Sequence, residues 1–252
     1  MHAHDAGFAM VVIAALFIAF SVIAAVAIER NSATQLISRR DSGAQQLTRI
    51  SNALIEYSVA NISNGTLYYP CPALETILTS SASFGAASTG CSSTAGDVVG
   101  PPATTASGLA ILGTNVIRGM VPVQELAPYG VTLTDAFDPW NNRIEYIVNR
   151  RLTKGSAATA ASSQGTNPTV THQTTGTLIA PPDFILLSYG RDGIGAFRRG
   201  KTSVDIACPT ASAVLRLHNC GVSTNFYVAP TNTGSAATGA TYFDDVLTYY
   251  RQ

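Results

Sequence analysis

An uncharged apolar stretch near the N-terminus constrains this chain more than any other feature. From Phe8 to Ile28, the 21 residues include one polar residue, Ser21, and no charge, glycine or proline. As an α-helix, the stretch would rise about 1.5 Å per residue and cover roughly the 30 Å hydrocarbon core of a bilayer. The rest of the 252-residue chain is more polar. The sequence therefore predicts a protein that is held in a membrane by its N-terminus or is processed there.

Three interpretations of this stretch are open. A secretory signal peptide would be cleaved after Ala25-Val26-Ala27, but the apolar run is longer than usual and residues 1–7 contain no Lys or Arg. In the second interpretation, the stretch is a plain transmembrane anchor, which needs no cleavage. In the third interpretation, residues 1–7 are a short leader that is removed between Gly7 and Phe8. By the positive-inside rule, three basic residues after the stretch would keep the C-terminal domain in the cytoplasm: Arg30, Arg39 and Arg40.

The composition of the chain instead favours export. Only 12% of the residues are charged, about half the usual quarter, and the formal net charge is zero. A neutral chain has no basic field to attract a phosphate backbone, so we expect no nucleic-acid partner.

The four cysteines form two close pairs in sequence, Cys71/Cys91 and Cys208/Cys220. An even number of cysteines at short spacing in an exported chain predicts two disulfides, and this local pairing closes the smallest loops. Buried free thiols are the alternative. A zinc site is less favoured, because no pair has CxxC spacing and His218 is the only nearby histidine.

The helix is predicted to continue beyond the apolar stretch. No glycine or proline follows Arg30 until Gly43, and apolar residues recur at steps of three and four: Leu36, Ile37, Ala44, Leu47, Ile50, Leu54 and Tyr57. We therefore expect a leader at residues 1–7, one helix over residues 8–62 with a transmembrane part at 8–28, and a globular domain at 63–252. The amphipathic half of the helix must lie against that domain.

Three segments of the globular domain are predicted to be strands. Residues 143–148 and 184–189 are rich in β-branched and aromatic residues, and residues 242–250 supply a final strand. Residues 119–123 are a shorter candidate. Tracts of small polar residues at 79–108, 155–177 and 230–241 are predicted to be loops. A long N-terminal helix laid across an antiparallel sheet is an α+β fold.

Two motifs carry a resemblance to a known family. Asp-Pro-Trp-Asn-Asn at residues 138–142, with Tyr146 after it, resembles the Asp-Pro-Trp-Gly-Asn-x-x-x-Tyr signature of type II secretion pseudopilins. Ser188-Tyr189-Gly190-Arg191-Asp192-Gly193 is similar to the Ser-x-Gly-x-Asp-Gly turn that follows in those proteins. The acidic segment at 242–246 and the Tyr-Pro-Cys-Pro-Ala sequence at 69–73 resemble further features of prepilin-like proteins.

The resemblance to the type IV pilin-like family implies a fold, a function and partners. The fold would be pilin-like α+β: a long N-terminal helix, membrane-spanning in its first half, packed on an antiparallel β-sheet with long Ser/Thr-rich loops. The chain would be a minor pseudopilin or pilin-like subunit of a type II secretion or type IV pilus-like filament. Its partners would be other pilin-like subunits, a prepilin peptidase that cuts between Gly7 and Phe8, and the bacterial inner membrane. Its domain would be periplasmic before assembly.

The chain departs from the family at the fifth mature position. Most members carry a glutamate there, which is thought to pair with the N-terminal amine of a neighbouring subunit, whereas this chain has Val12. An unpaired charge in an apolar filament core is costly. The departure resembles the minor pseudopilin that occupies a filament tip.

The resemblance also raises a calcium site. Major pseudopilins bind calcium in the loop after the Ser-x-Gly-x-Asp-Gly turn, and Asp192 and Asp205 flank that loop here. Calcium takes six to eight oxygen ligands. Four cations crowd the loop and oppose it: Arg191, Arg198, Arg199 and Lys201. A turn aspartate and a salt-bridged aspartate are therefore the preferred interpretation, and no other cofactor is expected.

No catalytic motif of the GxSxG, HExxH or P-loop kind occurs, so we predict that the protein is not an enzyme. A pair of His218 with Asp205 or Asp244 is less favoured than a surface histidine beside a disulfide. The alternative function is a membrane-anchored periplasmic binding or adhesion domain that does not polymerise. Trp140 is predicted to be largely buried beside Leu54 or Tyr57.

Overall fold

The computed structural model describes a helix and a sheet-rich body, with gaps between their segments. The described residues are 4–62, 67–89, 91, 104–105, 108–112, 115–153, 168–172, 175–179, 181–208, 219–221, 223–228 and 245–251; within the helix, the side chains of 4–12, 28–29 and 32–33 lie outside the description. The chain divides into two compact units, Met1–Arg39 and Arg40–Gln252.

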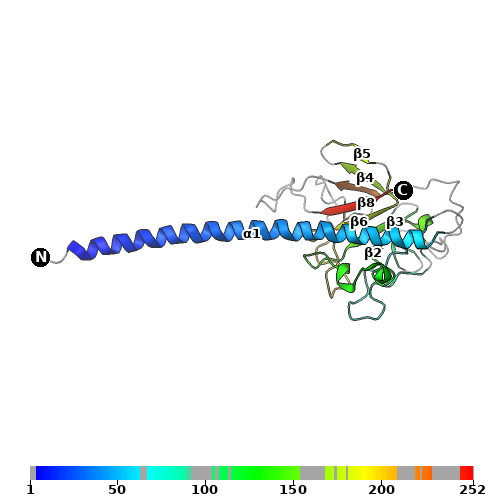
Figure 1. Cartoon of the computed structure of the whole chain (residues 1–252), viewed down its shortest axis with the longest axis horizontal. Helices are drawn as coiled ribbons and strands as arrows, with labels where there is room; N and C mark the ends of the chain where they lie inside the picture. The colour runs from blue at the N-terminus through cyan, green and yellow to red at the C-terminus, as the bar shows by residue number, and fades with distance from the viewer. Residues whose placement is uncertain are drawn as a thin grey trace. The chain divides into compact units, whose positions relative to one another are not determined.

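Helix α1 runs from His4 to Ala60 and contributes to both units (Figure 1). Its backbone includes Gly7 and Phe8. In the first unit, most of the apolar side chains that are described are exposed, among them Phe17 at 68%, Phe20 at 72% and Ile23 at 66%. In the second unit, the helix buries Leu47, Ile50 and Leu54 in the core. The two parts of α1 therefore have opposite relations to solvent.

The predicted fold class, a helix with a membrane-spanning first half packed along a sheet, is wrong. Among the residues that the structure describes, no helix is long and apolar enough to cross a membrane. The part of α1 that belongs to the same unit as the sheet begins at Arg40. The sheet-rich body, and not a long helix laid on it, dominates the fold.

The body contains a five-stranded antiparallel sheet in the order β1-β2-β3-β6-β8 (Figure 1). Its strands are β1 Ala110–Leu112, β2 Val116–Met120, β3 Glu145–Asn149, β6 Phe184–Ser188 and β8 Val246–Tyr250. The register places Glu145 opposite Met120 on one side and opposite Leu187 on the other. The central strands β3 and β6 are buried along their whole length, so both faces of the sheet are covered.

A second, three-stranded sheet has the order β5-β4-β7. Strand β4, Thr169–His172, pairs antiparallel with β5, Leu178–Ile179, and parallel with β7, Asn225–Val228. Three short 3₁₀ helices connect other segments of the body: η1 Ala127–Tyr129, η2 Leu133–Ala136 and η3 Arg150–Leu152. The three-stranded sheet falls partly in the tract at 155–177, which the sequence predicted to be a loop.

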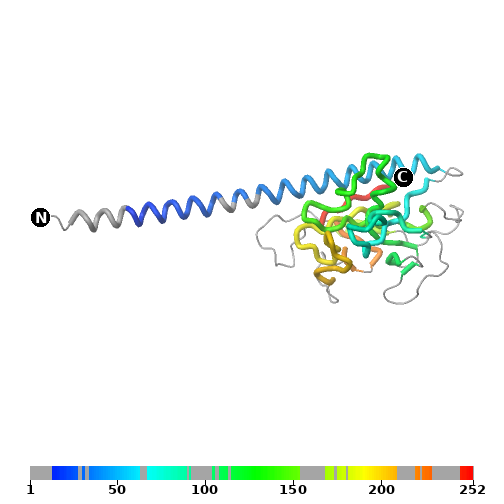
Figure 2. The backbone as a smooth tube through the Cα atoms, turned by 90° about the horizontal axis from the view of Figure 1, so that it is seen from below, coloured from blue at the N-terminus to red at the C-terminus, as the bar shows by residue number. Residues whose placement is uncertain are grey.

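The five-stranded sheet separates two hydrophobic cores. Because side chains alternate along a strand, Tyr146 and Val148 of β3 point to the core that holds Leu47, Ile50 and Leu54 of α1. Ile147 points to the other core, together with Val170 of β4 and Phe226 of β7. In Figure 2, β7, drawn in orange, lies on the side of the body away from the helix. The body is therefore layered as helix, sheet and second sheet.

Candidate functional site

The Asp-Pro-Trp-Asn-Asn motif forms a tight turn between η2 and β3, and the Asp138 carboxylate closes it. Asp138 Oδ1 accepts hydrogen bonds from the backbone N–H groups of Trp140, at 2.9 Å, and Asn142, at 2.8 Å. Asn141 adopts a left-handed conformation with φ of 66°, a region that asparagine tolerates better than most residues. The motif residues are thus those that this turn requires.

The second motif meets the first at the same carboxylate. Asp138 Oδ2 accepts a hydrogen bond from the Ser188 hydroxyl at 2.7 Å, at the end of β6, and another from Asn142 Nδ2 at 3.2 Å. Asn142 Nδ2 also donates to the Gly190 carbonyl at 2.6 Å. Burial raises the pKa of Asp138 to about 6, even though these hydrogen bonds act to lower the pKa. The two motifs thus form one buried polar cluster.

Trp140 is half-buried and does not lie where the sequence predicted. A Cβ placed on Gly43 of α1 would lie 3.4 Å from Pro139 Cδ and 3.8 Å from Trp140 Cζ3. Gly43 lies eleven positions before Leu54, or about 16 Å along the helix. Trp140 therefore packs where α1 enters the body, and the prediction that it lies beside Leu54 or Tyr57 is wrong. A Cβ at position 43 would be in ordinary van der Waals contact with the turn, so the contact does not require a glycine there.

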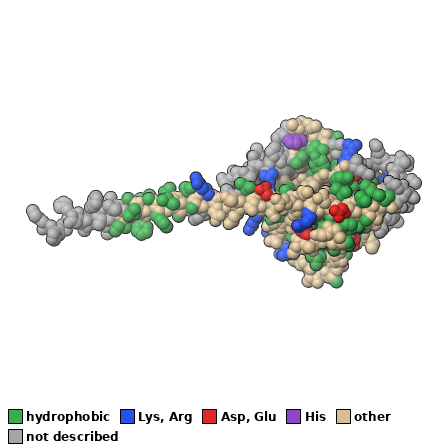
Figure 3. All heavy atoms as spheres, in the orientation of Figure 1, with side chains coloured by type: hydrophobic (Ala, Val, Ile, Leu, Met, Phe, Trp, Pro, Cys, Tyr) green, Lys and Arg blue, Asp and Glu red, His purple; other side chains and the backbone are tan. Residues whose placement is uncertain are grey.

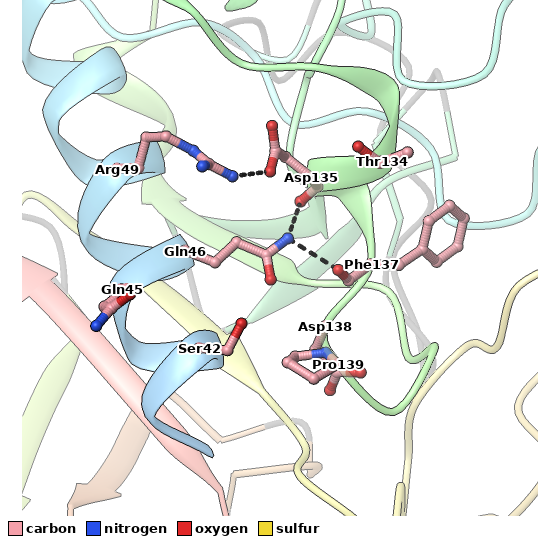
Figure 4. A pocket seen from close by; sticks show the side chains of 9 residues that line it. All are labelled: Ser42, Gln45, Gln46, Arg49, Thr134, Asp135, Phe137, Asp138 and Pro139. Carbon is pink, nitrogen blue, oxygen red and sulfur yellow. Dashed lines mark hydrogen bonds and ion pairs between the residues drawn. The ribbon is translucent and has the colours of Figure 1, made fainter. Parts of the chain in front are cut away.

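A pocket of about 480 Å³ lies between α1 and the segment that leads into this turn (Figure 4). Its lining is mostly polar and comes from the helix on one wall and from the η2 region on the other: Ser42, Gln45, Gln46, Arg49, Thr134, Asp135, Phe137, Asp138 and Pro139. All of these residues belong to the second unit.

Two helix side chains hold the walls of the pocket together. Gln46 Nε2 donates to the carbonyl oxygens of Asp135, at 3.2 Å, and Phe137, at 2.8 Å, and Arg49 forms an ion pair with the Asp135 carboxylate (Figure 4). Asp135 also caps η2 by accepting from the Thr132 backbone N–H at 2.8 Å. The pocket thus offers amide, hydroxyl and guanidinium groups, which suit a small polar ligand better than an apolar one.

The two candidate calcium ligands each have a protein partner. Asp192 Oδ1 accepts from the Ile194 backbone N–H at 3.1 Å, and Asp205 Oδ2 lies 3.6 Å from Arg198 Nε. Among the described residues, no group of three or more histidine, cysteine, aspartate or glutamate side chains is placed to hold a metal. Calcium binding at Asp192 and Asp205 stays a prediction.

The cysteine predictions are confirmed. Cys71 is joined to Cys91 and Cys208 to Cys220, with Cα atoms 6.0 and 5.9 Å apart. Cys71 and Cys91 belong to the core beside α1, whereas Cys220 belongs to the core between the sheets. A Cβ on Gly195 would lie 2.4 Å from Cys220 Cβ, so only glycine lets this backbone approach the second disulfide. Each disulfide therefore fastens loop segments to a different core.

Other predicted residues lie outside what the structure describes. His218 and Asp244 are outside the described residues, and so are the side chains of Gly7, Phe8 and Val12. Cleavage between Gly7 and Phe8 therefore stays a prediction.

Comparison of the chain with protein-family models, with curated proteins and with solved structures finds no match. The family resemblance therefore rests on the motif residues alone.

Sequence reasoning missed two residues of the helix that line the pocket, Gln46 and Arg49. Both follow the polar face of an amphipathic helix, where glutamine and arginine are ordinary solvated residues. The only feature that distinguishes these two residues is their position opposite a turn-rich segment. The tertiary fold, and not the local sequence, brings that segment to the helix. Sequence reasoning also missed the contact of Asp138 with Ser188, although it singled out both motifs.

Proposed function

We propose that this protein is a structural subunit of a pilin-like filament, of the minor pseudopilin kind, and that it assembles through the apolar part of α1. The observation that carries the proposal is the exposure of that part: Phe17, Phe20 and Ile23 are each about two-thirds or more exposed. Figure 3 shows hydrophobic side chains along this stretch of the helix. A contiguous exposed apolar surface marks a site of association.

The association partner in this proposal is the corresponding helix of other pilin-like subunits. Helices that leave the bilayer exchange lipid contacts for contacts with neighbouring helices, and van der Waals packing between their side chains drives the association. The body does not need α1 before Arg40 for its own core, because its buried apolar residues all come from Leu47 onward among the described residues. A division of labour between an assembly helix and a self-contained body supports a structural role, not an enzymatic one.

The proposal includes the compartment and the processing enzyme. Two disulfides form and persist in oxidising compartments, which supports a periplasmic location for the body, with the N-terminus at the bacterial inner membrane until assembly. A prepilin peptidase would remove residues 1–7 and leave Phe8 as the first residue of the filament subunit. N-terminal sequencing of assembled protein tests this step directly.

Substitution of Phe17 tests the assembly role. Phe17→Asp places a charge in the proposed helix–helix contact and should abolish higher-order assembly, as measured by sedimentation and electron microscopy. Leu133→Asp is the matched control, because Leu133 is also exposed, at 57%, but lies on the body. Its assembly should be unchanged. Equal loss in both variants, or none in either, contradicts the proposal.

The pocket beside α1 favours one alternative, a periplasmic binding or adhesion domain that does not polymerise. Its polar lining and volume of about 480 Å³ suit a small polar group. Oligomeric state and adhesion distinguish the two functions. The binding domain is supported instead if the chain remains monomeric with its apolar helix intact, and if the Ser42→Trp variant loses adhesion because the pocket is filled.

A further inference from the structure

Five side chains form one continuous stack beside the turn that precedes β3. In order along the stack they are Arg199, Phe137, Phe84, Arg143 and Phe197. Arg199 Cζ lies 4.6 Å from the centroid of the Phe137 ring, and the Phe137 and Phe84 rings are parallel within 5°, with centroids 5.5 Å apart. Arg143 Cζ lies 5.3 Å from the Phe84 centroid and 6.0 Å from the Phe197 centroid. The stack thus joins three segments that are distant in sequence and has an arginine at one end.

The two arginines of the stack differ in their partners. The terminal nitrogens of Arg143, a residue that is 1% exposed, donate to the backbone carbonyls of Glu75 and Lys201. Arg199 is exposed, and the described residues give its guanidinium no hydrogen bond and no ion pair. A guanidinium carries five N–H donors in a rigid plane. Arg199 therefore lies over an aromatic ring while its donors have no acceptor within the described part of the chain.

A tight turn presents Arg199 to solvent. The Lys201 backbone N–H donates to the Arg198 carbonyl at 3.1 Å, which closes a four-residue turn with Arg199 and Gly200 at its tip. Gly200 has a φ of 76°, and a Cβ placed on it would meet no described atom within 4 Å, so the tip is open. The Arg199 backbone N–H donates to the Asn141 carbonyl at 3.0 Å. Both the backbone and the side chain of Arg199 are thus fixed to the body.

The loop around Arg199 is strongly basic for a chain of zero net charge. Residues 191–201 contain four basic residues and one acidic residue, which gives the loop a net charge of +3. Arg198 is engaged, because its Nε lies 3.6 Å from Asp205 Oδ2, but Arg191 and Lys201 are exposed. At physiological ionic strength such charges act over roughly 8 Å. The loop therefore attracts a negatively charged partner to the site where Arg199 is held.

We propose that Arg199 binds a carboxylate group on an acidic segment of a partner protein. A planar guanidinium matches a planar carboxylate through two parallel hydrogen bonds. The stack on Phe137 already restricts the Arg199 side chain, so less entropy is lost when these bonds form. A phosphate dianion carries twice the charge of a carboxylate, whereas one guanidinium lies over the ring. Because a single exposed ion pair contributes little, the occupant needs the further contacts that a protein segment supplies.

This carboxylate site is distinct from the pocket and from the assembly helix. Figure 4 shows the Phe137 ring turned away from the pocket, whereas its carbonyl accepts from Gln46. Every residue of the stack belongs to the second unit, so the site does not depend on the apolar helix of the filament proposal. Phe17→Asp should therefore leave the binding of an acidic peptide unchanged. Failure of the carboxylate site can thus be distinguished from failure of filament assembly.

Binding of an acidic peptide to the full-length chain tests the proposal. The probe is a hexaglutamate peptide with blocked ends and a fluorescent label, titrated at low ionic strength and followed by anisotropy. Arg199→Lys keeps the charge but removes the planar fork, so it should weaken binding about three- to tenfold. Arg191→Lys is the matched control at another exposed arginine of the loop, and it should change the affinity less than about twofold. Equal affinity of the two variants, or no binding by the unsubstituted protein, overturns the proposal.

Nuclear magnetic resonance identifies the group that binds. The side-chain N–H signal of Arg199, assigned by its absence in Arg199→Lys, should move when the peptide is added, whereas the signal of Arg191 should not. Movement of the Arg191 signal alone refutes the site. Competition distinguishes the two kinds of anion, because acetate should displace the peptide more effectively than inorganic phosphate at equal ionic strength. More effective displacement by phosphate shows a phosphate site and refutes the carboxylate assignment.

Discussion

The Ser188 hydroxyl donates a hydrogen bond of 2.7 Å to Asp138 Oδ2 and so ties the end of β6 to the turn before β3. Both residues are buried, Ser188 completely and Asp138 to 4% exposure. The same turn carries Pro139 and Trp140 to the backbone of α1 at Gly43. One carboxylate therefore fixes the relation of the sheet, the turn and the helix wall of the pocket.

Removal of the Ser188 hydroxyl should destabilise the body. Ser188→Ala leaves a buried carboxylate with one donor fewer, and a lost hydrogen bond to a charged group costs about 1.5–3 kcal/mol of unfolding free energy. The pKa of Asp138 should also rise, because this hydrogen bond lowers it. Urea denaturation measures the first effect, with the exposed Ser83→Ala as a control that should change stability by less than about 0.5 kcal/mol. Equal stability of the two variants would contradict a structural role for the contact.

The stability of the body should fall as the pH rises through the range in which Asp138 ionises. The folded-state pKa of about 6 lies above the unfolded value of about 3.9, so the folded state binds this proton more tightly. The resulting stabilisation is fully present below about pH 4 and is lost as the pH rises through about 6; a shift of this size corresponds to about 3 kcal/mol.

Comparison with Asp138→Asn isolates that contribution, because other buried carboxyl groups titrate in both proteins. The stability difference between the unsubstituted protein and the variant should be largest at low pH and should shrink between about pH 4 and 6. Denaturant midpoints across this range provide the measurement. A difference that grows as the pH rises would mean that the folded protein favours the ionised carboxylate, contrary to the effect of burial.

The disulfides should contribute unequally. On the loop-entropy model, the sequence separations of 20 and 12 residues correspond to about 3.3 and 2.8 kcal/mol. Cys71 and Cys91 are also both buried in the core beside α1, so the double variant Cys71→Ala/Cys91→Ala loses apolar contacts as well. It should therefore be less stable than Cys208→Ala/Cys220→Ala in thermal unfolding. The reverse order would show that the second disulfide constrains more of the chain than its short loop indicates.

Local sequence signals predicted the disulfides and much of the main sheet, whereas the second sheet and the site required tertiary information. Residues 184–189 and 143–148 are rich in β-branched and aromatic residues and overlap β6 and β3. Strand β4 escaped prediction because only Val170 of its four residues is an aliphatic residue that packs inward. Its parallel partner β7 lies more than fifty residues away, a pairing that no local pattern encodes. Trp140 was misplaced for a related reason, since the helix periodicity does not show which turn of α1 a distant loop contacts.

The contact of Gly43 with the Pro139–Trp140 turn leads to the last prediction. A Cβ at position 43 would lie 3.4 Å from Pro139 Cδ, which is ordinary van der Waals contact, so alanine fits. Alanine also has the higher helix propensity, and Gly43→Ala should stabilise the body by up to about 1 kcal/mol. Gly43→Leu instead drives a branched side chain into Pro139 and Trp140 and should cost about 1–3 kcal/mol. Thermal unfolding with tryptophan fluorescence reports both, because Trp140 is the only tryptophan in the chain. If the leucine variant is as stable as the alanine variant, the turn does not rest on the helix at Gly43.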